Sequence, residues 1–136
     1  MNNSDNVLFL LTPKKDVEYL YGDFSIRQAL EKMEFHRYTM IPVIDKATGT
    51  YLYSLREGDI LWYLKDHHVP WGATEREPIA QIGVSRKIQA VSISATLEDL
   101  APLIIMQNYV PITDDHGVFI GIVTRKAVMN AYLKKD

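Results

Sequence analysis

Three consecutive polar residues, Thr124, Arg125 and Lys126, stand where the C-terminal pattern predicts a helix to begin. The first backbone N–H groups of a helix lack intrahelical partners, and together with the helix dipole they attract anions. Arg and Lys oppose that dipole, so two cations at a helix N-terminus favour an anionic group, such as a phosphate, bound beside them. A threonine N-cap followed by an exposed basic helix start accounts for the same residues without a ligand.

A related group, Arg56-Glu57-Gly58-Asp59, stands at an earlier predicted helix start. An arginine in this position can bind a phosphate through two N–H groups, or it can be a solvated surface residue. Asp59 can accept hydrogen bonds from ligand hydroxyls, although an aspartate in the first turn is favourable in any helix. Both helix starts therefore indicate anion binding, and both also have a purely structural interpretation.

These helix starts belong to two copies of an internal sequence repeat. When Ser25 is set against Thr96, the stretch "KKDVEYLYGDFSIRQAL" lies over "SRKIQAVSISATLEDLA", and "MIPVID" and "YVPITD" follow at similar distances. Such self-similarity is typical of repeat architectures. Ser25-x-x-Gln28 and Thr96-x-x-Asp99 are both helix N-cap patterns.

Each copy is predicted to contain a strand, a helix, two strands joined by a tight turn, and a final helix. Alternating apolar residues predict the first strands, around Val17 to Tyr21 and around Ile88 to Ile93, and Pro102 is expected to bend the second copy's first helix. The other predicted elements are the strands 40–44, 51–55, 110–113 and 119–123 and the helices 58–64 and 125–133.

The repeats also set the predicted domain organisation. A copy of about 60 residues is marginal alone, because so small a domain buries too little surface. We expect repeat 1 at 10–64, a linker at 65–81 and repeat 2 at 82–133, together forming one module. The linker is rich in breakers and charges and is predicted to be a surface connection that Trp71 anchors.

Composition limits the class of protein. The chain has 136 residues, 47% of them hydrophobic, a net charge of −2 and no cysteine. The balanced charge argues against a nucleic-acid or membrane partner, and the missing cysteine excludes disulfides and thiolate chemistry. No bilayer-spanning run and no signal peptide is apparent, so we expect a cytoplasmic soluble protein. The four histidines lack metal-ligand spacing, and no metal site is expected.

The order of elements, with "IPVID" and "REGDIL" in one copy and "VPITD" and "GIVTR" in the other, resembles the CBS domain, which usually occurs as a tandem pair. The resemblance covers nearly the whole chain. It implies an α/β (α+β) fold of two pseudo-twofold-related β-α-β-β-α repeats packed through their sheets. It also implies clefts that bind adenosine-containing ligands (AMP, ADP, ATP, S-adenosylmethionine or a cyclic dinucleotide) and dimerisation into a disc.

The resemblance also assigns candidate ligand residues. The family places a Ser/Thr and, three residues later, a ribose-binding Asp at the start of the last helix. Here one copy keeps only the acid, Asp59 after Arg56, and the other keeps only the hydroxyl, Thr124 followed by Arg125 and Lys126. Basic residues at the start of each copy's first strand are further candidates: Lys14, Lys15, Arg86 and Lys87.

For the base, the family uses residues just before the strand proline, which are Thr39, Met40 and Ile41 in one copy and Asn108, Tyr109 and Val110 in the other. Thr39 and "TRK" also resemble stand-alone bacterial CBS proteins that bind cyclic di-AMP. Tyr53 replaces a glycine that the second copy keeps as Gly121. Tyr53 either stacks on a base or fills the cleft, and the second-copy cleft is the preferred site.

Three classes of function are possible for this sequence. No catalytic motif is apparent, so we do not expect an enzyme. The preferred hypothesis is a regulatory module that needs no cofactor, binds an adenine nucleotide between its repeats, forms a homodimer and signals by conformation to an unidentified protein target. The alternative is a dimerisation scaffold whose clefts no longer bind.

Overall fold

The computed structural model of the chain describes residues 6–84 and 87–134 and divides it into two compact units. One, here called the first-repeat unit, is Tyr19–Lys87. The other, the second-repeat unit, joins Met1–Glu18 to Ile88–Asp136. The sequence predicts repeats at 10–64 and 82–133. In the structure, residues 6–18 belong to the second-repeat unit, and the linker residues 65–81 belong to the first-repeat unit.

Within the first-repeat unit, two helices cover a small sheet in the order β2-β3-β4, in which β2 is parallel and β4 antiparallel to β3. Its elements are β2 (Leu20–Tyr21), α1 (Ile26–His36), β3 (Met40–Ile44), β4 (Tyr51–Arg56) and α2 (Glu57–Asp66). Apolar residues of α1, α2 and the strands form one core, including Ile26, Ile41 and Ile60. The predicted β-α-β-β-α order is confirmed here.

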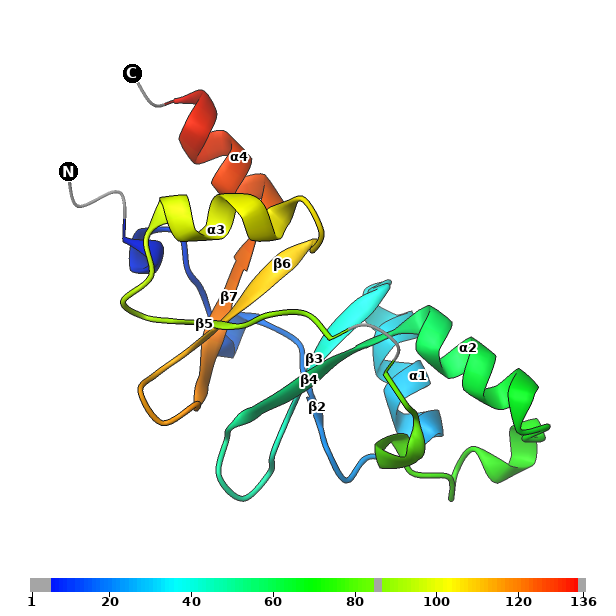
Figure 1. Cartoon of the computed structure of the whole chain (residues 1–136). Helices are drawn as coiled ribbons and strands as arrows, with labels where there is room; N and C mark the ends of the chain where they lie inside the picture. The colour runs from blue at the N-terminus through cyan, green and yellow to red at the C-terminus, as the bar shows by residue number, and fades with distance from the viewer. Residues whose placement is uncertain (1–5, 85–86, 135–136) are drawn as a thin grey trace. The chain divides into compact units, whose positions relative to one another are not determined.

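The second-repeat unit has the same order plus one strand, and its sheet is β1-β7-β6-β5. Its elements are β1 (Thr12–Pro13), β5 (Val91–Ser92), α3 (Leu97–Ile104), β6 (Tyr109–Thr113), β7 (Phe119–Thr124) and α4 (Arg125–Leu133). In Figure 1, α3 and α4 lie beside β6 and β7. Leu100, Val110 and Val128 belong to the shared core of these helices and strands. The mixed α/β class predicted from the sequence is confirmed.

The N-terminal segment contributes β1, which the sequence did not predict. Val7 is fully buried in the second-repeat core and donates its N–H to the carbonyl of Ala95. Thr12 and Pro13 then pair antiparallel with Ile122 and Gly121. Both predicted first strands are longer than the observed ones, β2 and β5. In the first repeat, the chain leaves β1 through a short 3-10 turn, Lys14–Asp16, before it enters β2.

The two β-hairpin turns are built alike, as their Asp and Gly residues predicted. Asp45 accepts hydrogen bonds from the N–H and hydroxyl of Thr48, and Asp114 accepts from the N–H groups of His116 and Val118. These bonds favour the charged carboxylate and lower the pKa of Asp45 and of Asp114. Glycines with positive φ, 78° at Gly49 and 82° at Gly117, end the turns.

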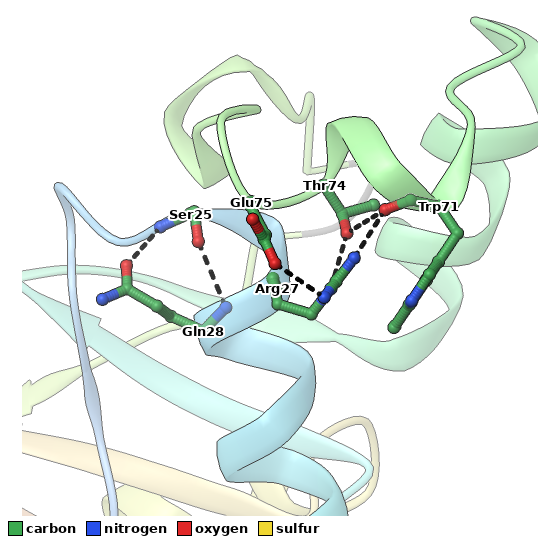
Figure 2. Close-up of polar contacts among 6 residues, drawn as sticks. All are labelled: Ser25, Arg27, Gln28, Trp71, Thr74 and Glu75. Carbon is green, nitrogen blue, oxygen red and sulfur yellow. Dashed lines mark hydrogen bonds and ion pairs between the residues drawn. The ribbon is translucent and has the colours of Figure 1, made fainter.

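The linker is folded onto the start of α1, as Figure 2 shows. The Arg27 guanidinium donates to the Thr74 hydroxyl (2.9 Å), to Glu75 (3.1 Å) and to the Trp71 carbonyl (2.7 Å), and it stacks on the Trp71 ring. In addition, the N–H groups of Ile26 and Arg27 donate to linker carbonyls. The linker therefore supplies partners that the first turn of α1 would otherwise lack.

Candidate functional site: two equivalent helix starts

In each unit, the fold brings the residues before the strand proline against the start of the last helix. Met40 pairs with Arg56 across β3 and β4, and Tyr109 pairs with Thr124 across β6 and β7. The N–H of Glu57 donates to the Thr39 carbonyl at 2.9 Å, and the N–H of Arg125 donates to the Asn108 carbonyl at 2.8 Å. The first helical amide of α2 and of α4 is thus satisfied within the protein.

In the second-repeat unit, the candidate residues also have structural partners. The Thr124 hydroxyl accepts from the N–H of Ala127 at 3.0 Å, which makes Thr124 the N-cap of α4. The Arg125 side chain donates through Nε to the Ile104 carbonyl, 2.7 Å away, at the end of α3. A cation there is favourable, because helix C-termini carry negative partial charge. Lys126 is exposed and projects from the same helix start.

In the first-repeat unit, a carboxylate inside the helix forms the cap, instead of a hydroxyl at the N-cap position. Asp59, which is 8% exposed, accepts from the N–H of Arg56 at 3.0 Å. Thr96 and Asp99 make both bonds of a capping box at the start of α3. Thr124 makes only the bond of the N-cap hydroxyl, and Asp59 makes only the bond of the carboxylate three residues after the N-cap. The Ser/Thr-x-x-Asp pattern is therefore a helix cap as well as a candidate nucleotide motif.

The residues expected to contact a base differ in accessibility. Ile41 and Val110 are completely buried core residues, and Tyr109 is 7% exposed. Thr39 and Asn108 are exposed, and Met40 is half-buried. Side chains of Thr39, Met40 and Asn108 are thus available at the surface, whereas Ile41 and Val110 can offer only their main chain to a ligand.

The basic residues near the first strands are not gathered with Thr124. Lys14 and Lys15 lie in the second-repeat unit, in the turn that follows β1. Because β1 is antiparallel to β7, the chain beyond Pro13 runs toward the start of β7, away from Thr124 at its end. Lys87 is exposed, and Arg86 lies outside the described residues.

A hollow is present in each of the two units. A pocket of about 280 Å³ in the first-repeat unit is lined by Thr39 and Glu57 together with α1 and the loop after it. A wider hollow of about 430 Å³ in the second-repeat unit is lined by Gln89, Ser92, Ser94 and the α3 residues Asp99 and Pro102. Of the predicted site residues, Thr39 alone lines either hollow.

The glycine position of the second hairpin strand separates the two repeats most clearly. Gly121 has φ 155°, and a side chain there would overlap the Thr12 carbonyl oxygen of β1. Its counterpart Tyr53 packs against the first-repeat core. The Tyr53 hydroxyl is buried and has no hydrogen-bond partner among the described residues, and burial raises the pKa of Tyr53.

Sequence reasoning overlooked Gln107, which is 5% exposed. Its amide accepts from the N–H of Gln89 (2.8 Å) and donates to the carbonyls of Gln89 (3.1 Å) and Tyr109 (3.0 Å). This side chain connects the segment before β5 to Tyr109, two residues before the strand proline. The available signal in the sequence was a polar residue, Gln107, between the apolar pair Ile105-Met106 and the predicted strand 110–113.

The described residues contain no cluster of acidic, histidine or cysteine side chains able to hold a metal ion. No helix in the described part of the chain is long and apolar enough to span a bilayer.

Comparisons with known proteins agree with the repeat. The CBS domain family matches residues 10–66 and again 79–134. Among curated proteins, the sequence search finds no match.

Several solved structures are similar to this chain. CbpB in complex with c-di-AMP has a TM-score of 0.86 and 22% identity over 96% of this chain and 85% of that one. A CBS domain protein from Streptococcus pneumoniae TIGR4 has a TM-score of 0.81 and 23% identity, covering 94% and 88% of the two chains. CBSX2 in complex with AMP has a TM-score of 0.76 and 26% identity, covering 96% and 97%.

Proposed function

Because this chain belongs to the CBS domain family, with two CBS domains in tandem, we propose that it is a regulatory module that binds an adenine nucleotide and passes the signal to a protein partner. The ligand class is AMP, ADP, ATP or cyclic di-AMP. The proposal is supported by CBSX2, which binds AMP, and by CbpB, which binds c-di-AMP. We further propose that it acts in the cytoplasm, as a homodimer and without catalysis.

The observation that carries the proposal is the convergence of surface groups at the two helix starts. In the second-repeat unit, exposed Lys126 and Asn108 flank the N-terminus of α4, and Arg125 is the first residue of this helix. A phosphate bound there would meet positive charge and the helix dipole together. In the first-repeat unit, exposed Thr39 stands at the position of Asn108, and Arg56 stands at the position of Thr124. We assign the higher affinity to the second-repeat site.

A scaffold without ligand is the second candidate, and the split capping box favours it. Thr124 and Asp59 each satisfy a backbone N–H, so both residues have a role that needs no nucleotide. Under this hypothesis the hydroxyl and the carboxylate persist as helix caps after the clefts lost their ligand.

A thermal-shift panel separates the two functions. It should contain AMP, ADP, ATP, S-adenosylmethionine and cyclic di-AMP, each at three concentrations. A ligand at 100 times its dissociation constant stabilises the native state by about 2.7 kcal/mol, which raises the melting temperature by several degrees. A concentration-dependent shift with at least one adenine nucleotide is expected. Equal melting temperatures across the panel would favour the scaffold.

A further inference from the structure

The hollow of about 430 Å³ in the second-repeat unit lies between the strand β5 and the helix α3, and its volume is typical of ligand pockets. β5 is an edge strand, because the order of its sheet is β1-β7-β6-β5. Ser92 of β5 pairs with Thr113, whereas Thr124 pairs with Tyr109 at the opposite end of β6. We call this the edge hollow, and its lining includes Gln89, Ser92, Ser94 and Ala95 on the strand side and Asp99 and Leu103 on α3.

In the first repeat, aromatic side chains occupy the matching positions. When the two repeats are aligned, Ser92 stands at the position of Tyr21, and Ala95 stands at the position of Phe24. The Tyr21 ring packs edge-on against the rings of Tyr19 and Phe24, with centroids 5.7 and 5.8 Å away. Two small residues of the second repeat thus replace two aromatic ones, which fits the edge hollow to an aromatic side chain supplied from outside.

The first repeat also protects its edge strand with a lysine. Lys32 of α1 donates from Nζ to the Tyr19 carbonyl at 2.7 Å, and its Nζ lies 5.3 Å from the centroid of the Tyr19 ring. Lysines at sheet edges hinder pairing with another chain. In the second repeat, Ala90 and Leu103 stand at these two positions, and a leucine has no hydrogen-bond donor to offer. The edge at β5 lacks this protection, which favours pairing with an extended segment of another protein.

The polar groups of the edge hollow are suited to a cation and a hydroxyl. Asp99 carries the one charge among the described residues that line it, and the first repeat has neutral Gln28 at this position. Asp99 accepts from the N–H and hydroxyl of Thr96 through Oδ2, so its Oδ1 can accept from a ligand. The hydroxyls of Ser92 and Ser94 share one hydrogen bond of 2.7 Å, and the pair therefore retains one hydroxyl hydrogen to donate.

We propose that the edge hollow is the docking site for a protein partner, and that it receives an extended segment in which a tyrosine and a lysine stand two residues apart. The inference rests on the proposed function for the existence of that partner. Side chains two residues apart in an extended segment lie on one face. The tyrosine ring fills the space beside Ser92 and Ala95, the lysine meets Asp99, and the backbone of the segment pairs with the edge at β5.

The test is a titration with the synthetic peptide acetyl-Ala-Tyr-Ala-Lys-Ala-amide, followed by the NMR amide signals of Gln89, Ser92 and Ser94. We expect saturable shifts with a dissociation constant of about 1 mM or below. Alanine in place of the peptide's tyrosine, or glutamate in place of its lysine, should weaken binding about tenfold. Tyramine has the ring and the amine but no peptide backbone, and it should also bind about tenfold more weakly than the peptide.

Two variants of the chain connect the shifts to the edge hollow. Ser92→Tyr introduces the side chain that the first repeat has at this position and should abolish binding. Asp99→Asn keeps an oxygen for the cap of α3 but removes the charge, so the lysine peptide should lose about fivefold in affinity. A peptide with alanine in place of its lysine should bind Asp99→Asn and the unmodified chain equally. Asp115→Asn, in the exposed β6–β7 turn, makes the same change outside the hollow and is the control.

Three outcomes overturn the proposal. The first is a peptide that gives no saturable shifts up to about 10 mM. The second is binding that persists in a folded Ser92→Tyr, or that Asp99→Asn changes no more than Asp115→Asn does. The third is tyramine that binds as tightly as the peptide, which would make the hollow a site for a small aromatic amine. Melting temperatures show which variants are folded, and the assay contains no nucleotide and changes none of the proposed nucleotide ligands, so the thermal-shift panel judges the nucleotide hypothesis separately.

Discussion

The two repeats share their order of elements, but they differ at the glycine position of the second hairpin strand and at the start of the last helix. In the second repeat, Gly121 lies under β1 and Thr124 caps α4 with its hydroxyl. In the first, Tyr53 occupies the glycine position and Asp59 supplies the cap from inside the helix. A duplicated fold is thus maintained by different residues in each half.

The largest expected effect comes from the glycine position. Gly121→Ala would place a Cβ against the Thr12 carbonyl in a backbone conformation that disfavours side chains, and we expect a loss of about 3 kcal/mol in unfolding free energy. Gly117→Ala, with φ 82° but open space around it, should lose only about 1 kcal/mol. Urea denaturation measures both. Equal losses would mean that β1 does not restrict position 121.

The linker clamp on Arg27 is the next largest difference, because no such set of bonds is seen at Glu98 among the described residues of the second repeat. Arg27→Ala removes three hydrogen bonds and a ring contact and is expected to cost about 2 kcal/mol. Glu98→Ala, at the matching position of α3, should change unfolding free energy by less than about 0.5 kcal/mol. If both variants have the same unfolding free energy, the clamp seen in Figure 2 contributes no stability.

Much of this architecture follows from local sequence. The pattern predicts Met40–Ile44 and Arg125–Leu133 with the limits that the structure has. Ser25 and Thr96 begin their helices as their capping patterns predict. These elements are specified within a few residues, by caps, turns and apolar periodicity.

The features that the sequence did not reveal depend on distant partners. Thr12 pairs with Ile122, and no local pattern in "LTPKK" identifies that strand. Arg125 is an ion-binding candidate by type, and only its contact with the Ile104 carbonyl reveals the structural role. Gly121 was noted in the sequence as a glycine that the first repeat replaces by Tyr53, but the strand β1 that covers it was not predicted.

Two tyrosines of β4 provide a finer comparison. Tyr53→Phe removes a buried hydroxyl without a described partner, so we expect unfolding free energy to stay the same or rise by up to about 1 kcal/mol. Tyr51→Phe removes a 2.9 Å bond to the Ser54 hydroxyl and should lose about 1 kcal/mol. Thermal denaturation of both variants checks this, and a loss in Tyr53→Phe as large as in Tyr51→Phe would show that the Tyr53 hydroxyl has a partner.

The smallest effect is one that the repeats should share. The folded-state pKa of Asp45 and of Asp114 lies below its ordinary value, so each turn contributes stability that is fully present above that value and is lost as pH falls through the folded-state pKa. Asp45→Asn and Asp114→Asn should each flatten the acid limb of a melting-temperature profile slightly and similarly. A strong effect of one alone would contradict the equivalence of the turns.

Calorimetric titration with the nucleotide that gives the largest thermal shift tests the central claim most directly. Lys126 is the cleanest residue to change, because it is exposed at the start of α4. We predict saturable binding whose affinity falls about tenfold in Lys126→Ala and much less in Arg56→Ala, at the start of the first-repeat helix α2. The absence of binding heat with every adenine nucleotide, or an affinity that neither substitution changes, would contradict the account.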